Sequence, residues 1–108
     1  MTHGRCLCGT VRYEVGGPFL NMLHCHCSMC RKHHGTPFAT WAAASLAGFR
    51  YTAGESAVVR YDSSPGFHRS FCSLCGSVAP EGIEAIGMVI WPAGNVEEDL
   101  GIRAQLHI

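Results

Sequence analysis

The cysteines constrain the fold of this chain more than any other feature of its sequence. Seven of the 108 residues are cysteine, an odd number, and they form three short clusters: Cys6 and Cys8, then Cys25, Cys27 and Cys30, then Cys72 and Cys75. Thiols this close in sequence bridge each other poorly as disulfides, whereas thiolates on one tight turn can converge on a metal ion. An odd count also cannot close into a complete disulfide framework. The pattern therefore predicts bound metal, with Zn²⁺ as the expected ion.

Composition and charge exclude several classes of protein. Hydrophobic residues make up 47% of the chain and charged residues 15%, which argues against a disordered chain. Eight basic side chains balance eight acidic ones, and they form no basic stripe that would bind nucleic acid. The longest uncharged stretch, residues 35–49, is too short and too polar to span a bilayer. Because the first residues do not resemble a signal peptide, we predict a cytoplasmic protein that binds neither nucleic acid nor membrane.

Spacing alone allows two divisions of the thiolates between metal sites. In a zinc-ribbon arrangement, two C-x-x-C pairs hold one ion: Cys27, Cys30, Cys72 and Cys75. The other arrangement has a four-thiolate site and a three-thiolate site: Cys6, Cys8, Cys72 and Cys75 in the first, and Cys25, Cys27 and Cys30 in the second. The second arrangement uses every cysteine, whereas the first leaves three without a metal. Spacing favours the second only slightly, so both stay open at this point.

Short segments of alternating or apolar residues, separated by turns, predict a mainly β fold in a single domain over residues 1–108. In residues 10–15, Val11, Tyr13 and Val15 share one face, as in a half-buried strand. A short helical turn is expected over residues 28–34, ending at Gly35. Further strands are expected over residues 19–24, 38–43, 49–52, 57–61, 67–71 and 83–91. Residues 105–108 stop in the middle of an apparent strand, so we expect a C-terminal tail to follow them.

Three motifs resemble those of one enzyme family. The opening GRCLCGTV (residues 4–11), the central HCHCSMCRK (24–32) and the closing RSFCSLCGS (69–77) are similar to motifs of the glutathione-dependent formaldehyde-activating enzymes. Gly35 and Phe38 after the central motif, and a Pro-Ala-Gly turn at residues 92–94, extend the similarity. The matches run in order across nearly the whole chain, and the central motif is the most specific of them.

The resemblance implies a fold, a division of the cysteines and an activity. The fold is the mainly β one first described for a zinc-bound Rab-exchange factor. The four-thiolate site (Cys6, Cys8, Cys72 and Cys75) would hold a structural Zn²⁺, and the three-thiolate site (Cys25, Cys27 and Cys30) a catalytic one. Named members of the family are carbon–sulfur lyases that join glutathione and formaldehyde into S-hydroxymethylglutathione. The implied partners are therefore a small-molecule thiol, glutathione first, and an aldehyde.

The residues by themselves leave the three-thiolate site either open or closed. Three thiolates around Zn²⁺ leave one negative charge, which suits a fourth soft ligand such as a thiol better than the activation of water. Arg31 and Lys32 are candidates to offset this charge or to attract a carboxylate of a peptide. In a closed site, a nearby histidine is the fourth ligand, and His33, three residues after Cys30, is the best placed. His26, between two ligands, is expected to point away and to bond to backbone.

Two classes of function follow from these alternatives. The first is a zinc-dependent enzyme that forms or cleaves a thiol–aldehyde adduct, with an exchangeable fourth ligand at the three-thiolate site. The second is a non-catalytic zinc module that binds a protein partner, with a histidine closing that site. A zinc-dependent methionine sulfoxide reductase would need a spare redox cysteine, which the four-plus-three division does not leave.

Overall fold

The strands assemble into three sheets in the computed structural model, which describes residues 1–101, 103–104 and 106–108. The first sheet has the strand order β1-β2-β5: Thr2–Arg5, Arg12–Val15 and Phe49–Ala53. The second has the order β10-β3-β4-β9-β8: Leu106–His107, Phe19–Cys25, Ala39–Ser45, Met88–Pro92 and Glu81–Ile83. The third is the antiparallel hairpin of β6 and β7: Val58–Ser64 and Phe67–Cys72.

Helical segments are short and lie between the strands. The α-helix α1 spans Ser28–His34, as predicted, and ends at Gly35, whose φ of 68° is in the left-handed region that glycine adopts without strain. In the described part of the chain, four short 3-10 helices each connect two strands: η1 (Leu46–Gly48), η2 (Glu55–Ala57), η3 (Glu84–Ile86) and η4 (Ala93–Asn95). No helix among the described residues is long and apolar enough to cross a membrane.

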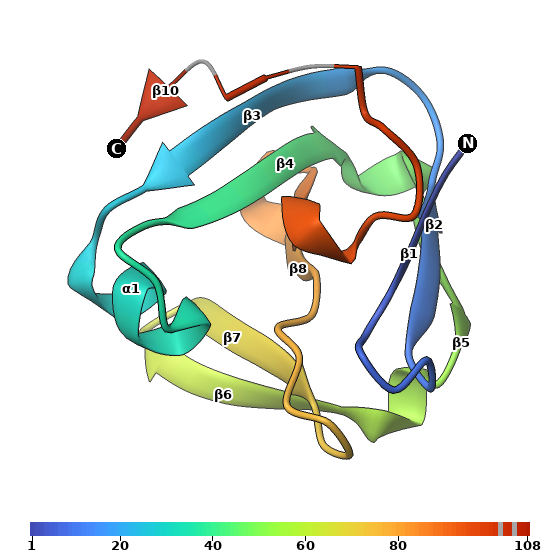
Figure 1. The fold of residues 1–108 in the computed structure, drawn as a ribbon, viewed down its shortest axis with the longest axis horizontal. Coiled ribbons are helices and arrows are strands. Elements are labelled where there is room, and N and C mark those ends of the chain that lie inside the picture. Colours follow the sequence, from blue (N-terminus) through green and yellow to red (C-terminus); the bar gives the residue numbers. More distant parts are fainter. Residues whose placement is uncertain (102, 105) are drawn as a thin grey trace.

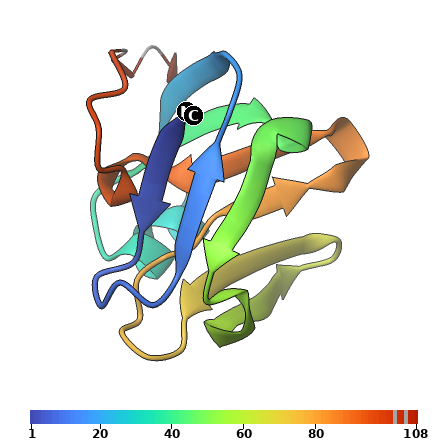
Figure 2. The same ribbon diagram turned by 90° about the vertical axis from the view of Figure 1, so that its right-hand side faces the viewer.

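The sheets surround a common interior. Figure 1 shows β3 and β4 along the top, the β6–β7 hairpin along the bottom and α1 at the left, while β1, β2 and β5 close the right-hand side. Figure 2 shows these last three strands side by side. The three-stranded sheet contributes Tyr13 and Val15 to a core cluster in which Ala42, Ala44 and Trp91 come from the five-stranded sheet. Alanine at the central positions of β4 leaves room for the large indole ring between the sheets.

Most strand predictions are confirmed. Val11, Tyr13 and Val15 are each 1% exposed, so the alternation in residues 10–15 did identify the buried face. The segments predicted over residues 19–24, 38–43, 49–52, 57–61 and 67–71 are β3, β4, β5, β6 and β7, with ends shifted by a few residues. Near the C-terminus, β10 pairs in parallel with β3. Gln105, part of the strand predicted there, lies outside the described residues.

The prediction of one core strand over residues 83–91 was wrong. The segment turns back at η3 and Gly87, so that β8 and β9 pair as an antiparallel hairpin with Gly82 opposite Val89. Gly87 has a φ of 65°, and its N–H donates to the carbonyl of Glu84 at 3.1 Å, which closes the turn. Periodicity alone does not separate a continuous apolar strand from two short ones joined by a tight glycine turn. The strand β1 was not predicted at all.

Candidate metal centres

The structure brings together the sulfur atoms of four cysteines from two distant segments of the chain. The sulfurs of this four-thiolate cluster lie within 4.8 Å of one another: Cys6, Cys8, Cys72 and Cys75. Cys6 and Cys8 lie between β1 and β2, Cys72 ends β7, and Cys75 follows it. The sulfur of Cys8 is 3.6 Å from that of Cys6 and 4.0 Å from that of Cys72. Tetrahedral Zn²⁺ with bonds of about 2.3 Å would separate its sulfur ligands by about 3.8 Å, so the cluster fits a zinc ion.

Two glycine turns shape the four-thiolate cluster. Gly9 and Gly76, each directly after a cysteine, have φ of 81° and 80°. The N–H of Gly9 donates to the carbonyl of Cys6 at 3.1 Å, and that of Gly76 to the carbonyl of Cys72 at 2.8 Å. Because a left-handed residue turns the backbone sharply without a Cβ clash, both sulfurs of each pair can face the same point. The two turns are therefore local structures that become one site only when the fold joins them.

Hydroxyl and backbone groups favour the thiolate form of two members of this cluster, Cys75 and Cys8, whereas burial raises the pKa of Cys72. The Ser77 hydroxyl lies 3.3 Å from the sulfur of Cys75 and, as the largest contribution, lowers the pKa of that thiol to about 5. The Thr10 hydroxyl likewise lies 3.3 Å from the sulfur of Cys8, and it is the largest cause that lowers the pKa of Cys8. Ser77 also accepts a hydrogen bond from the N–H of Leu7 at 2.9 Å, which ties the two turns together. Thiolates are the form that binds metal, so these contacts prepare the site for an ion.

The three-thiolate cluster is built from one short segment. Its sulfurs, from Cys25, Cys27 and Cys30, also lie within 4.8 Å of one another. Cys25 ends β3, Cys27 caps the N-terminus of α1, and the N–H of Cys30 donates to the sulfur of Cys27 at 3.4 Å. That contact is the largest cause that lowers the pKa of Cys27 to about 7. Cys25 and Cys30 are buried and Cys27 is exposed, so the cluster has one side in the core and one toward solvent.

An apolar wall covers the inner side of this cluster. Cys25 and Cys30 pack with the buried residues Ala39 and Trp41 of β4, and Leu23 lies against the same group. Burial raises the pKa of Cys25 more than any other factor. A metal ion held here would therefore be shielded from water on one face, where electrostatic interactions are stronger than in bulk solvent.

Histidine does not complete this cluster. Among the described residues, no histidine nitrogen joins the group of the three sulfurs. His24 instead bonds through Nδ1 to the Thr40 hydroxyl at 2.9 Å. The Nε2 atoms of His33 and His34 are buried without a hydrogen-bond partner, and burial is the main cause that lowers the pKa of both, for His34 to about 4.

His26 does not join the group of sulfurs, and its ring bonds to another histidine where a bond to backbone was predicted. Its Nε2 lies 2.9 Å from Nδ1 of His107 on β10. Because β10 comes from the far end of the chain, local reasoning about the Cys25–Cys30 segment had no means of finding this contact. His26 is therefore held by tertiary structure in a position that keeps its ring away from the thiolates.

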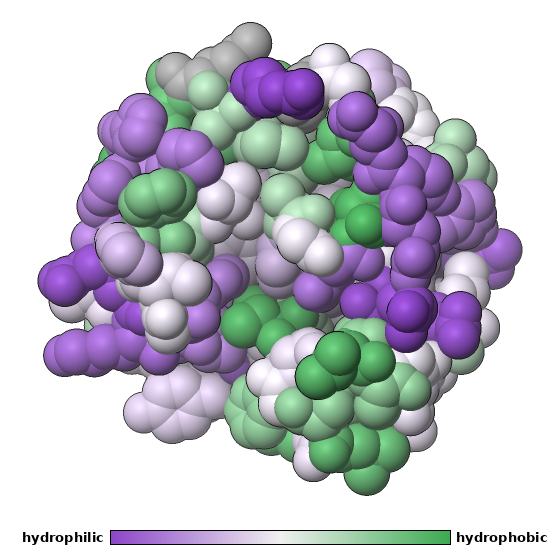
Figure 3. Space-filling model, in the orientation of Figure 1, coloured by the Kyte–Doolittle hydropathy of each residue, from purple (hydrophilic) through white to green (hydrophobic). Residues whose placement is uncertain are grey.

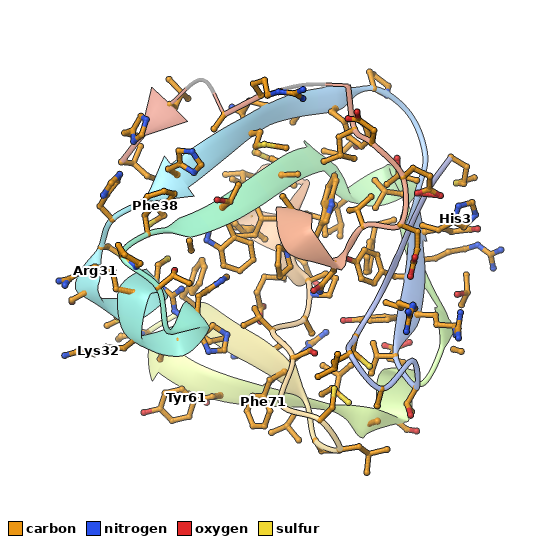
Figure 4. All side chains as sticks on the ribbon, in the orientation of Figure 1. His3, Arg31, Lys32, Phe38, Tyr61 and Phe71 are labelled. Carbon is orange, nitrogen blue, oxygen red and sulfur yellow. The ribbon has the colours of Figure 1, made fainter. Side chains whose placement is uncertain are left out.

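The basic residue at the three-thiolate cluster is one to which the sequence analysis gave no role. Figure 4 shows Arg31 and Lys32, the predicted candidates, projecting outward from α1, and Figure 3 shows a mainly hydrophilic surface there. Arg31 donates from Nε to the carbonyl of His26 at 3.1 Å. Arg69 of β7, only 9% exposed, donates from Nη1 to the sulfur of Cys30 at 3.1 Å. The sequence signal that could have found it is an arginine inside the strand predicted over residues 67–71, three residues before Cys72.

A cavity of about 550 Å³ lies elsewhere, between β5, the β6–β7 hairpin and β8. Tyr51, Arg60 and the buried Glu81 are among the residues around it, and no cysteine lines it. Burial raises the pKa of Glu81. The two groups of convergent metal-binding side chains therefore lie outside this cavity.

Comparison with known proteins places the chain in a family. The model of a family described as glutathione-dependent formaldehyde-activating enzyme matches residues 1–108. The chain belongs to this family. Among proteins with curated descriptions, none matches the chain significantly.

A solved structure shares the fold of this family member. It is the crystal structure of a Rhodobacter sphaeroides protein from structural genomics, with a TM-score of 0.79 and 24% sequence identity. The match covers 98% of this chain and 99% of the other. At that identity it shows the fold, a mainly β single domain. Within this domain, the chain described here has two cysteine clusters that can each hold a metal ion.

Proposed function

We propose that the chain is a zinc-dependent, carbon–sulfur lyase-like enzyme that forms or cleaves a thiol–aldehyde adduct. Glutathione and formaldehyde, with S-hydroxymethylglutathione as the adduct, are the first candidates, because the family carries their names. The observation that carries the proposal is the three-thiolate cluster, whose exposed member, Cys27, faces solvent and which no histidine joins in the described part of the chain. A catalytic zinc site has three protein ligands and an exchangeable fourth position.

Each cluster has its own task in this proposal. Cys25, Cys27 and Cys30 would hold the catalytic ion, and Zn²⁺ bound there would supply a Lewis acid that takes up a soft thiol as thiolate. The apolar wall around Trp41 keeps water from the inner face of the site. The four-thiolate cluster would hold a structural Zn²⁺, because four sulfurs leave no position for a substrate.

The proposed reaction needs no reagent besides the thiol and the aldehyde. The substrate thiol loses its proton, and its sulfur attacks the aldehyde carbon, so that a carbon–sulfur bond forms. The electron pair of the carbonyl π bond moves to oxygen, which takes up a proton and becomes the hydroxyl of the adduct. Cleavage is the reverse. The chain would orient the reaction by holding the sulfur on the solvent side of the cluster, next to Cys27.

The cytoplasm is the compartment that suits this chemistry. Metal-binding thiolates persist where glutathione and thioredoxin keep thiols reduced, and glutathione itself is abundant there. We therefore propose a cytoplasmic location for the enzyme.

An exchange measurement tests the proposed function. Magnetisation-exchange NMR with ¹³C-formaldehyde and glutathione gives the rate at which the adduct forms and breaks. We expect the zinc-loaded protein to raise this rate above the uncatalysed one. The matched control is Cys27→Ser, which retains an N-cap acceptor for α1 but removes a soft ligand. Its exchange rate is expected to fall to the uncatalysed value.

Two results would contradict the proposal. Fully zinc-loaded protein that leaves the exchange rate unchanged excludes glutathione and formaldehyde as substrates. A histidine nitrogen bound to the second metal, with no spectral change on adding any thiol, excludes the open site and favours a protein-binding zinc module.

A further inference from the structure

The contact between Arg69 and Cys30 joins a buried cation to a candidate metal ligand. The guanidinium donates from Nη1 to the Cys30 sulfur at 3.1 Å, and its Cζ lies 5.1 Å from the centre of the Phe67 ring. Its Nε is buried and has no hydrogen-bond acceptor. β7 therefore brings a buried positive charge directly against the three-thiolate cluster.

No carboxylate among the described residues forms an ion pair with Arg69. Ion pairs in the described part of the chain involve His3, Arg5, Arg50 and His68, and none of them includes Arg69. A buried guanidinium without an anionic partner is strongly destabilising. The sulfur of Cys30 is the partner that the structure provides, so Arg69 and the thiolate cluster compensate each other.

The positive charge of Arg69 affects how readily the metal centre binds a fourth ligand. Three thiolates and a divalent ion carry one net negative charge, which repels an incoming thiolate. With the guanidinium of Arg69 beside Cys30, the centre and its surroundings are neutral. The N–H···S bond also draws electron density from Cys30, which makes this sulfur a weaker nucleophile toward an aldehyde.

We propose that Arg69 is a positioning residue that neutralises the three-thiolate metal centre, so that the centre can accept an anionic thiolate as its fourth ligand. The inference rests on the proposed function, since it needs a metal at Cys25, Cys27 and Cys30. It assigns to β7, and not to the basic residues of α1, the electrostatic part of thiol binding.

Cadmium NMR can test this on the folded protein with both sites loaded. In ¹¹³Cd-substituted protein, the four-thiolate and three-thiolate sites give separate resonances, and Cd²⁺ has the charge of Zn²⁺. Titration with 2-mercaptoethanol, whose thiol proton passes to the buffer, follows binding of the fourth ligand by the shift of the second resonance. The first resonance reports in each variant whether the protein is folded.

Three variants separate charge, hydrogen bond and position. Arg69→Gln removes the charge and retains an N–H donor, and we expect it to weaken thiol binding on the order of tenfold or more, the scale of one unit charge inside a protein. Arg69→Lys retains the charge and should bind the thiol more tightly than Arg69→Gln. Lys32→Met removes an exposed charge from α1 as the matched control, and its thiol affinity should match that of the native protein.

The outcomes distinguish this inference from the proposed function. If the native protein binds 2-mercaptoethanol and Arg69→Gln binds it equally well, the role of Arg69 is contradicted while the open site stands. If Lys32→Met weakens binding as much as Arg69→Gln, general surface charge and not Arg69 is responsible. If the native protein shows no thiol-dependent shift at the second resonance, the open site and the inference both fail. Should Arg69→Gln lose the first resonance, Arg69→Met takes its place as the variant without charge, because its apolar side chain needs no anionic partner when buried. Its thiol affinity is then expected to fall as for Arg69→Gln, and an affinity equal to that of the native protein contradicts the role of Arg69.

Discussion

The two cysteine clusters differ in how far they reach along the chain. The four-thiolate cluster joins Cys8 to Cys72, 64 positions apart. The three-thiolate cluster lies between Cys25 and Cys30, on the end of one strand and the first turn of one helix. A metal at the first would cross-link distant parts of the fold, whereas a metal at the second would fix one turn. The same residue type in similar spacing can therefore join distant segments of the chain in one place and order a single turn in another.

The two clusters also differ in the side chains that surround them. Small hydroxyl groups, Thr10 and Ser77, lie beside the four-thiolate cluster. The three-thiolate cluster packs with Trp41 and accepts a hydrogen bond from Arg69. The first environment supplies hydroxyl contacts without adding charge, and the second adds a positive charge beside the cluster that we propose binds a substrate thiolate. The first three of the following predictions separate the two clusters by a measurement, and the fourth serves as a reference away from both.

The largest effect is expected from Cys72→Ala. If zinc acts as a cross-link over 64 positions, the chain-entropy model gives about 4 kcal/mol of stabilisation. That is comparable with the whole stability of a small domain, so the variant should lose its cooperative unfolding transition. Thermal unfolding followed by circular dichroism measures this. A sharp transition near the native midpoint would show that the cluster does not hold the fold together.

Cys27→Ser should affect stability less and metal content more selectively. The segment closed at the second cluster is only a few residues long, for which the same model gives about 2 kcal/mol. We expect the protein to keep a cooperative transition at a lower temperature and to lose one of its two metal ions, measured by elemental analysis. Loss of both ions would mean that the clusters are not independent sites.

Two glycine variants compare the local turns of the clusters. Gly76 and Gly35 have φ of 80° and 68°, and no atom would touch an added Cβ at either. Alanine at each position therefore adds only backbone strain, about 1 kcal/mol. Gly76→Ala should weaken the four-thiolate site, and Gly35→Ala, at the end of α1, the three-thiolate site. Chelator competition at both sites measures this, and a pair of variants that weaken the same site would contradict it.

The smallest effect is expected from Glu98→Gln, which lies near neither cluster. The backbone N–H of His3 is the main cause that lowers the pKa of Glu98. Because the folded pKa lies below the unfolded one, the carboxylate contributes stability above the unfolded pKa and loses it as pH falls through the folded pKa. Glu98 is exposed, so the variant should show a slightly flatter acid loss of stability than the native protein. A steeper loss, measured as melting temperature against pH, would contradict the assignment.

The sequence predicted those parts of the protein that depend on neighbouring residues. Strict alternation located the buried face of Val11, Tyr13 and Val15, because side chains on a strand point alternately to its two faces. The helix over residues 28–34 ended where Gly35 provides a left-handed residue. Cysteine spacing predicted metal sites because thiolates on one turn need no distant partner to converge.

Tertiary structure alone decided what depends on distant pairing. The sulfurs of Cys6 and Cys72 meet only because the β1–β2 turn and the end of β7 are brought together. His24 and His26 bond to Thr40 and His107, which lie on other strands, and not to the three sulfurs. Arg69 reaches Cys30 because β7 passes beneath α1. Local torsions and side-chain periodicity are encoded in neighbouring residues, whereas contacts between distant segments exist only once the whole chain has packed.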